Sequence, residues 1–523
     1  MKTKPVLSKS NLLAYRQCAK RLWLEVHAQE LGVDATEVCA RVAEGRRVGK
    51  VAQEILGPGH KFDVMTEGAA AVITRTAAKV ATTSRTLSRR KPLFEAGFEA
   101  NGVRVFADAV IPVQGPANEL PRWVIIEVKA TTKMADVYYD DAAIQYSTAL
   151  AAGLELDAIE IALVNNEWVF GDSDDNADEG NDYRGLLKYV DVTQEIQALV
   201  REVPSWVKAA HAVMASPEAP FIPTGAQCGD PYPCRFLMHC KSSEPAVKHP
   251  IQWLPRVQTI VLREHLAKPS VQDMRDVPNK LLNASQLRVK NATLTGRKYF
   301  DVEGAAEALS GYAEPIYFLD FETVGNAVPR WWGARAYQQI PFQFSLHRLG
   351  ADGELSHDAF LDISGKDPRR ALAKALIKAC ADPTGKADTT TGTIFTYNVS
   401  FEARCIRELA EYVGAKSVLG KALYAIAKRL ADLAPVVREH FYHPSQQGSW
   451  SLKAVLPVLI PQLSYDSLDG VKNGQDAQLA YAEATDAKCL QPRMAELREQ
   501  LLKYCELDTL ALVAIWRKFS GKA

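Results

Sequence analysis

Residues 316–324 read IYFLDFETV, and this stretch sets the start of a folded unit. Apolar side chains flank Asp320 and Glu322, which predicts a buried strand that carries two carboxylates. Because residues two apart in a strand point to the same face, the two acids project together. A pair of carboxylates on one face supplies the oxygen ligands that Mg²⁺ and Mn²⁺ prefer.

Two later segments add the acids that a two-metal site needs. The predicted strand TIFTYN, 393–398, leads into a helix that carries Glu402. Near the C-terminus, LLKYCELDTLALVAIW predicts an amphipathic helix with Tyr504 and Asp508 four residues apart, hence on one face. Four carboxylates from separated segments can bind two metal ions ~3.5–4 Å apart, one activating water and one steadying the leaving oxygen. Tyr504 is placed to position the water.

These three motifs, in this order over residues 313–523, resemble those of the DEDD exonucleases of the ribonuclease H-like fold, in their tyrosine subtype. The resemblance implies a mixed sheet with helices and metal-dependent release of nucleotides from the 3′ end. It makes Asp320, Glu322, Glu402 and Asp508 the metal ligands. The second motif ends in Glu402 where the family has Asp, and Asp432 is the other acid that would complete the set.

A second acidic site is expected upstream, around the stretch WVIIEVKA at 123–130. Glu127 and Lys129 project from one face of this predicted strand, and Asp108 ends the strand VRVFADAV before it. The charges would otherwise face an apolar core at a real energetic cost. An acidic pair can hold Mg²⁺ or Mn²⁺, and a neighbouring lysine can orient or deprotonate the attacking water.

Asp108, Glu127 and Lys129, followed by a helix with Gln145, resemble the PD-(D/E)XK nucleases of the RecB type. The resemblance implies that Asp108 and Glu127 bind metal, that Lys129 is catalytic, and that Gln145 supports the site or the substrate. The family has Tyr four residues after the Gln; here that position is Ala149, and Tyr146 is adjacent instead. No upstream metal-binding His is evident, which leaves three acids open as the fourth ligand: Glu44, Glu54 and Glu95.

Three cysteines stand close together in CGDPYPCRFLMHC, at Cys228, Cys234 and Cys240. Four thiolates can hold an iron–sulfur cluster or a tetrahedral zinc ion. Cys18 and Cys39 compete to be the fourth ligand. The other cysteines, Cys380, Cys405, Cys489 and Cys505, are scattered and are expected in the core.

One cysteine before the nuclease motifs and three after them resemble the iron–sulfur RecB family, which includes CRISPR-associated exonucleases and AddB helicase–nuclease subunits. The resemblance implies a [4Fe-4S] cluster on Cys18, Cys228, Cys234 and Cys240, with zinc as the alternative because the C-x5-C-x5-C spacing is wider than usual. Such a cluster would staple the two ends of the domain in a structural role.

The remaining sequence predicts an α/β protein of three segments: a nuclease domain at 1–245, a connector at 246–312, and an exonuclease-like domain at 313–523. Within the first we expect helices at 8–30, 37–56 and 140–154, a hairpin at 92–113 that turns at Asn101-Gly102, and a strand at 159–166. The whole resembles a bacterial family that joins these two nuclease domains.

Composition excludes several other classes. The 523 residues carry 62 basic and 62 acidic side chains, which argues against a uniformly basic coat but leaves room for a local basic groove. No apolar run is long enough to span a bilayer and no signal segment is evident, so we expect a cytoplasmic protein that does not enter membranes. Nine cysteines are too few for a disulfide scaffold.

The predicted reaction is hydrolysis of DNA, from single-stranded ends, in DNA repair or defence against foreign DNA. Two rival hypotheses are an RNA exonuclease and a non-cleaving scaffold that binds nucleic acid for a helicase or a defence-system partner. Two further features fit a nucleic-acid surface or, equally, ordinary packing. They are Lys453 and the aromatic stretch 329–347 with Arg330, Trp331, Trp332 and Arg335.

Overall fold

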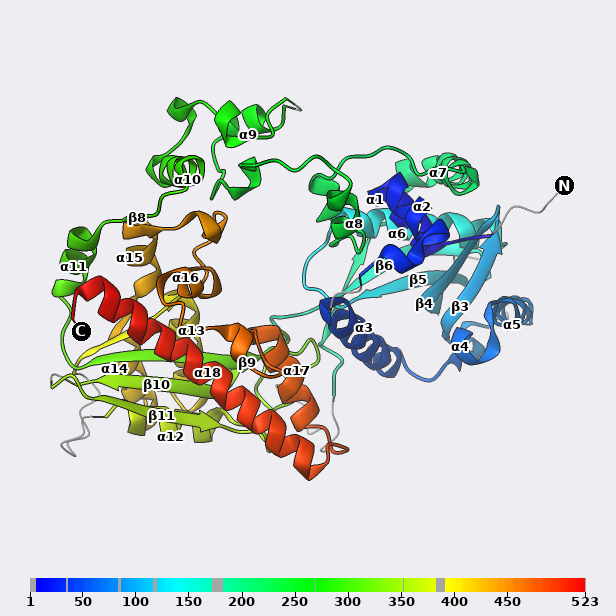
Figure 1. The fold of residues 1–523 in the computed structure, drawn as a ribbon. Helices are drawn as coiled ribbons and strands as arrows, with labels where there is room; N and C mark the ends of the chain where they lie inside the picture. Colours follow the sequence, from blue (N-terminus) through cyan, green and yellow to red (C-terminus); the bar gives the residue numbers. More distant parts are fainter. Residues whose placement is uncertain are drawn as a thin grey trace. The chain divides into compact units, whose positions relative to one another are not determined.

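The computed structural model describes residues 6–33, 36–82, 86–115, 120–171, 182–268, 270–350, 352–381 and 391–522, without the side chains of 36–40. The chain forms two compact units: Met1–Pro245 with Asn326–Gln338, and Ala246–Gly325 with Gln339–Ala523. Each unit is a mixed sheet packed with helices, so the predicted α/β class is confirmed (Figure 1). Within the described part of the chain, no helix is long and apolar enough to cross a membrane.

The first unit contains a sheet of seven described strands in the order β2-β3-β4-β5-β6-β7, with β1 paired to β4. The β1–β4, β2–β3 and β5–β6 pairs are parallel and the other neighbours antiparallel. The strands are β1 (Leu7–Ser8), β2 (His60–Lys61), β3 (Leu93–Ala100), β4 (Val103–Val113), β5 (Arg122–Lys129), β6 (Leu156–Val164) and β7 (Leu187–Asp191).

The hairpin expected at 92–113 is confirmed. Strands β3 and β4 are joined by Asn101 and Gly102, whose φ angles are 52° and 78°. Both residues lie in the left-handed region that a two-residue hairpin turn requires, and Asn and Gly tolerate it best. The turn sets the β3–β4 register and thereby the position of Asp108.

Helices cover both faces of this sheet. They are α1 (Lys9–Gln17), α2 (Ala19–His27), α3 (Thr36–Ile55), α4 (Val64–Glu67), α5 (Ala69–Ala81), α6 (Asp136–Ala151), α7 (Gln197–Ala215) and α8 (Leu237–Ser242). On one face Val48 of α3 packs in a core with Ile126 of β5. On the other, Ile144 of α6 packs with Ile125. Alternation along β5 therefore directs Glu127 and Lys129 to the α6 face.

The prediction of a single helix at 8–30 is wrong in one respect. Ser8 caps α1 as expected, but the helix breaks at Cys18, whose extended backbone (φ −166°, ψ 120°) ends α1 and begins α2. An extended residue between two helices changes the direction of the chain, which no local sequence pattern indicates. The break places Cys18 at a corner beside the later cysteines.

The second unit has a five-stranded sheet in the order β11-β10-β9-β12-β13. Strand β10 is antiparallel to β9 and β11, whereas β9, β12 and β13 run parallel. The strands are β9 (Ile316–Val324), β10 (Ile340–Leu349), β11 (Leu355–Leu361), β12 (Thr393–Thr396) and β13 (Leu430–Asp432); β8 (Tyr299–Phe300) and β14 (Phe441–Tyr442) pair separately.

The long helix α18 (Gln491–Ser520) crosses one face of this sheet, and it is the red helix of Figure 1. It packs Val513 and Trp516 against Phe318 of β9. The opposite face holds Leu319 and Phe321 against three helices, α12 (Arg369–Ala379), α13 (Val399–Tyr412) and α14 (Val418–Ala427). The remaining helices are α15 (Leu433–His440), α16 (Leu452–Leu459) and α17 (Gly474–Ala484).

Residues 246–312, expected as a connector, form helices that belong to the second unit. They are α9 (Ile260–Leu266), α10 (Ala284–Thr295) and α11 (Val302–Ser310). Their buried side chains Leu262, Met274 and Val289 share one core with Trp516 of α18. The sequence showed no clear period here because the helices are short and joined by irregular turns.

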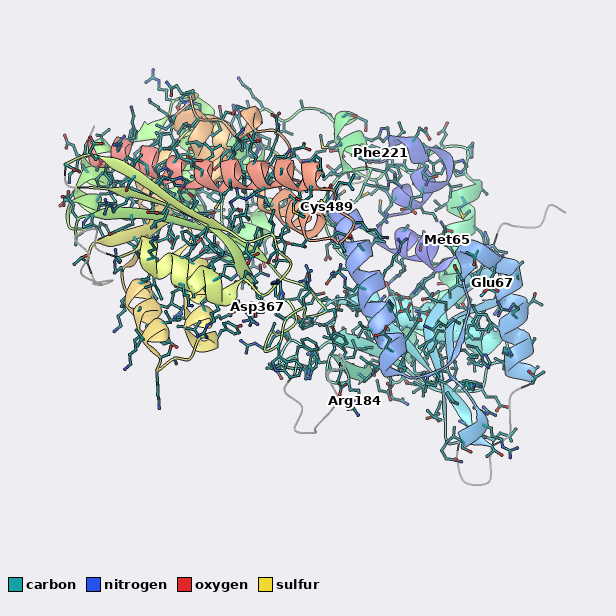
Figure 2. All side chains as sticks on the ribbon, turned by 90° about the horizontal axis from the view of Figure 1, so that it is seen from below. Met65, Glu67, Arg184, Phe221, Asp367 and Cys489 are labelled. Atoms are coloured by element: carbon teal, nitrogen blue, oxygen red, sulfur yellow. The ribbon has the colours of Figure 1, made fainter. Side chains whose placement is uncertain are left out.

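The stretch 326–338 between β9 and β10 belongs to the first unit. Arg335 bridges Val169, and the Phe170 amide donates to the Ala334 carbonyl at 2.9 Å. Trp331 is buried, whereas Trp332 is 66% exposed with its ring against Phe170. The first unit also exposes single apolar side chains such as Met65 and Phe221 (Figure 2), which are common on protein surfaces and indicate no site.

One close approach fastens residues 246–312 to the rest of the second unit. Gly448 has a φ of 82°, and a Cβ there would overlap the Trp253 backbone, whereas Gly353, with a φ of 83°, has no atom within 4 Å of such a Cβ. We expect Gly448→Ala to lower the free energy of unfolding of this unit by about 2–4 kcal/mol and Gly353→Ala by about 1 kcal/mol. Urea denaturation of the full chain measures both, and equal losses would contradict the close approach.

Candidate functional site

Asp320, Glu322 and Asp508 of the second unit lie on the α18 face of the sheet, and Glu402 approaches Asp320 from α13, which packs on the opposite face. Alternation along β9 directs Asp320 and Glu322 to the side on which Phe318 packs against α18. Glu402 lies in the first turn of α13 and Asp508 in the middle of α18. The structure therefore brings together the four acids that the sequence motifs singled out.

Burial and the charges of neighbouring acids raise the pKa values of these carboxyl groups. Burial, and then the charges of Asp508, Glu322 and Glu402, raise the pKa of Asp320 well above its usual value. Burial and Asp508 raise the pKa of Glu322 to about 8, and burial raises that of Asp508 to about 6 and that of Glu402 to about 7. Buried like charges of this kind are costly unless protons or cations neutralise them.

Two tyrosines and a lysine border the four acids. The Tyr465 hydroxyl donates a hydrogen bond to Asp508, and Tyr504 also bonds that carboxylate. Lys453 Nζ lies 5.4 Å from the ring centre of each tyrosine. The motifs predicted Tyr504, and Lys453 was an open possibility. Tyr465 was missed, because it stands in a short 3₁₀ turn with no motif around it.

Cys505, expected as an ordinary core residue, lies inside this site. Its Sγ is 3.7 Å from Asp320 Oδ2, and one ligating atom each of Asp320, Glu322 and Cys505 fall within 4.8 Å of one another. Burial raises the pKa of the thiol well above its ordinary value, as do the neighbouring acids. The raised pKa favours a neutral thiol, so the two carboxylates are the members of this trio suited to hold a divalent cation. Of the others, Cys380 and Cys405 are buried as expected but Cys489 is not.

Asp432, the alternative to Glu402, lies close by but in another role. Its carboxylate accepts from the Ala434 amide at 3.0 Å and caps α15. It raises the pKa of Glu402, yet it is not among the groups that act on Asp320, whereas Glu402 is. Glu402 Oε2 is also buried with no hydrogen-bond partner among the described residues. A cation is a natural partner for this orphan oxygen.

A groove of about 910 Å³ lies at the start of α13, and Asp432 is the acid that lines it. Asn398, which begins α13, lines it, and Tyr397 lies near enough to Tyr465 to influence that hydroxyl. Its other walls come from residues 255–258 and 283–285 and from the segment before α16, and its polar and aromatic lining includes Arg256, Arg438, Asp432 and Trp450. Arg256 is exposed and has a φ of 47°, a conformation that costs energy in a non-glycine residue.

The first unit gathers its predicted residues around Glu127. The Gln145 side-chain amide donates to Glu127 Oε2 at 2.7 Å, and Lys129 Nζ lies 2.7 Å from Glu127 Oε1. Asp108 Oδ2 accepts from the Val128 amide at 2.7 Å. Burial and Glu127 raise the pKa of Asp108 well above its usual value. Asp108, Glu127, Lys129 and Gln145 therefore share one site.

Two charged residues of this site were missed. Asp141 of α6 lies 2.6 Å from Lys129 Nζ and accepts from the Gln145 amide at 2.9 Å. Lys9 of α1 lies 2.8 Å from Glu127 Oε1 and 3.0 Å from Asp141 Oδ1. Asp141 could have been found, since it stands one helical turn before Gln145. Lys9 carries no such signal, because it comes from more than a hundred residues away.

Glu95 joins the site through an irregularity in the sheet. It lies opposite Asp108 in the β3–β4 ladder and has a φ of 58°. Phe94 and Ala109 pack in one core and Ala96 and Ala107 in the other, so the alternation of faces slips in both strands at this point. Burial and Glu127 raise the Glu95 pKa. A local slip of this kind re-aims side chains.

The other two candidates for the fourth ligand are Glu44 and Glu54. Glu44 accepts a hydrogen bond from the Ala327 amide and lies 3.1 Å from Arg47. Glu95 is among the charged groups that most strongly raise the pKa of Asp108. Ala149, at the position where the resembled family has Tyr, is fully buried, with Tyr146 packed against the same core. Cys39, the alternative to Cys18, has no described side chain.

The charges of this first site do not balance. Glu95, Asp108, Glu127 and Asp141 oppose Lys9 and Lys129, which leaves two negative charges when all six groups are ionised. Asp141 keeps a pKa below its usual value, because the two lysines outweigh its burial. No three acids of the described first unit come within 4.8 Å of one another, since the lysines stand between them. A divalent cation fits the surplus charge if it displaces Lys9.

The four predicted cysteines line one small cavity of about 20 Å³. Burial raises the pKa of Cys234 and of Cys240, and the charges of Cys228 and Cys18 raise both pKa values further. All four are free thiols. Lys20 and Arg21 line the same cavity and would offset the charge of bound thiolates. The donor set therefore fits a metal or an iron–sulfur cluster.

The spacing of the sulfurs separates the two possible occupants. Tetrahedral zinc at about 2.3 Å from each sulfur places them about 3.8 Å apart. Among the described cysteines, no three sulfurs lie within 4.8 Å of one another. A four-iron cluster holds its thiolates farther apart, on separate iron atoms, so this spacing is compatible with it.

Comparison with known proteins adds one finding. Residues 317–451 match a family model described as a domain of unknown function, DUF2779. The match covers Asp320, Glu322 and Glu402 but ends before Tyr504 and Asp508. No curated protein is significantly similar to the chain in sequence.

The raised carboxylate pKa values generate a stability prediction. Glu322 has a pKa of about 8 in the folded chain against an ordinary 4.5, so its protonated form stabilises the fold, and that contribution is lost as pH rises through about 8. In EDTA-treated protein, hydrogen exchange of α18 amides should therefore quicken from about pH 5 to about pH 8.5, beyond the intrinsic change. Glu322→Gln should flatten this trend and the exposed Glu307→Gln should not; a flat wild-type profile would contradict the clustering of acids.

Proposed function

We propose that the chain is a metal-dependent nuclease with two separate active sites, one in each unit, that hydrolyses phosphodiester bonds of single-stranded DNA. One observation carries the proposal: the charges of Asp508, Glu322 and Glu402 all raise the pKa of the buried Asp320, and a buried oxygen of Glu402 has no hydrogen-bond partner among the described residues. Such a cluster is built to hold divalent cations rather than to stabilise the fold.

The topology of the second unit supports a ribonuclease H-like fold. Its strands run in the order 3-2-1-4-5 by chain position, and the second strand alone is antiparallel to the rest of the sheet. The first strand, β9, is central and carries Asp320 and Glu322. The C-terminal helix supplies Asp508 to the same face, as the DEDD resemblance implies.

In this unit, Asp320, Glu322, Glu402 and Asp508 would hold Mg²⁺ or Mn²⁺. Bound there, the ions supply an activated water and neutralise the leaving oxygen. Tyr504 and Tyr465 hold Asp508 in place through hydrogen bonds, and the Tyr504 hydroxyl can orient the water. Lys453 faces the phosphate side as a fixed positive charge beside the two rings.

The first unit supports a PD-(D/E)XK site through its element order. Helix α3 comes first and, after β2, α4 and α5, strands β3, β4 and β5, helix α6 and strand β6 follow, with Asp108 on β4 and Glu127 and Lys129 on β5. Asp108 and Glu127 would hold the cation, with Glu95 as the added ligand. Lys129 keeps its proton, because Asp141 and Glu127 outweigh its burial and raise its pKa; it therefore orients water and balances phosphate charge.

The cysteines of the first unit would hold a [4Fe-4S] cluster, with zinc as the alternative. The cluster serves the fold: Cys18 joins the start of the unit to Cys228, Cys234 and Cys240 near its end. The groove beside the second site supports a single strand as substrate, since arginines and aromatic rings line it. DNA rather than RNA, and a role in repair or defence, follow from the family resemblance alone.

Two variants test the independence of the sites. Asp320→Asn should reduce release of nucleotides from the 3′ end by at least about 100-fold, because a ligand on the central strand is lost. Lys129→Ala should abolish the other activity and leave 3′ release unchanged. Labelled single-stranded DNA and RNA, incubated with Mn²⁺ and the full-length protein, measure both activities.

Matched controls are Asp486→Asn and Lys208→Ala, two exposed residues outside both sites. Wild-type protein that binds DNA tightly without any cleavage would favour the scaffold hypothesis, and faster loss of RNA would favour the RNA exonuclease. If Asp320→Asn and Lys129→Ala each removed all cleavage, the two sites would not be independent.

The cysteine cluster has its own test. Cys234→Ser should remove the visible absorption of anaerobically purified protein and lower the melting temperature of the first unit, because the cluster joins segments far apart in sequence. Cys489→Ser, a partly exposed cysteine in the second unit, is the control. An unchanged spectrum and melting profile in Cys234→Ser would count against a bound cluster.

A further inference from the structure

A second set of ligating side chains lies at the edge of the sheet in the second unit. His347 on β10 and His357 on β11 face each other directly across the antiparallel ladder, and Glu506 stands on α18. One ligating atom from each of the three falls within 4.8 Å of the others. Glu506 is two residues from both Tyr504 and Asp508, so it points away from the carboxylate site.

Two hydroxyl groups fix the histidine rings. Thr509 Oγ1 donates to the Glu506 carbonyl at 3.1 Å and therefore accepts from His347 Nδ1 at 2.8 Å. Ser345 Oγ lies 2.6 Å from Thr509 Oγ1 and 2.9 Å from His357 Nε2. Because the Thr509 hydrogen is already committed, Ser345 donates to Thr509 and accepts from His357 Nε2.

These hydrogen bonds set the tautomer of both histidine rings. His347 carries its hydrogen on Nδ1 and His357 on Nε2, which leaves lone pairs on His347 Nε2 and His357 Nδ1. The latter lies 3.8 Å from Glu506 Oε1. Burial also lowers the pKa of His347 to about 4, so its ring is neutral. Metal-binding histidines commonly hold their other ring N–H in a hydrogen bond of this kind.

We propose that His347, His357 and Glu506 form a zinc site that joins the edge strand β11 to α18. Two imidazole nitrogens and one carboxylate suit zinc, with water in the fourth position, whereas Mg²⁺ prefers oxygen ligands throughout. The site is thus distinct in chemistry from the carboxylate cluster and does not depend on the proposed nuclease function.

Binding requires only the exposed partners to move. His347 is 4% exposed and held by Thr509, whereas His357 and Glu506 are exposed. The two rings stack with centroids 4.4 Å apart and planes 25° apart, so a shared ion needs the His357 ring to turn. Its position on an edge strand leaves room for that rotation. A purely structural pair would make the same hydrogen bonds without retaining zinc.

The test counts zinc in the full-length protein with its cysteine site loaded. After equilibration with zinc in excess Mg²⁺ and dialysis, elemental analysis should find about one zinc ion more per chain in wild type than in His357→Gln or Glu506→Gln. His265→Gln and Glu499→Gln, on α9 and on a separate turn of α18, are the matched controls and should retain the wild-type count.

Equal zinc in wild type and both ligand variants would overturn the site, as would an equal loss in the controls. A second measurement needs no variant: X-ray absorption at the zinc edge of wild type, before and after zinc addition. The added zinc should show nitrogen and oxygen neighbours alone. Sulfur neighbours around the added ion would assign it to the cysteines and overturn the proposal.

Discussion

Mutual repulsion among buried carboxylates is the constraint on which the second unit depends. Asp320 and Glu322 lie on the face of β9 that packs against α18. The packing that makes the core therefore also brings their charges close to that of Asp508. The raised pKa values express the cost of this arrangement. A fold retains such a cost where a cation removes it, and the proposed nuclease chemistry uses the same cation.

The first unit meets the same problem in another way. Lys9 and Lys129 already stand between the acids, and each pairs with Glu127 and Asp141. The ammonium of Lys9 thus occupies a place that a metal ion would take, and the surplus of two negative charges lies around Asp108 and Glu95. The two sites therefore differ in what a cation would have to displace: protons in the second, and the ammonium of Lys9 in the first.

Much of this arrangement could be predicted from local pattern. Strand alternation paired Asp320 with Glu322 and Glu127 with Lys129, and helical spacing paired Tyr504 with Asp508. Contacts set by tertiary packing could not be predicted: Lys9 reaches Glu127 across 118 residues, and Tyr465 comes from a short turn. Glu95 was one of three open candidates, and its place in the site depends on a slip in the sheet. Residues 246–312 were underestimated because their helices are short, and the helix break at Cys18 was missed because no local pattern indicates an extended residue there.

The most direct test of the account is anomalous diffraction at the manganese edge from crystals of the full-length protein equilibrated with Mn²⁺. We expect anomalous density among Asp320, Glu322 and Asp508 in the second unit, and between Asp108 and Glu127 in the first with Lys9 displaced. Density at neither place, with the acids still clustered at a pH above about 8, would contradict the claim that these carboxylates exist to bind divalent cations.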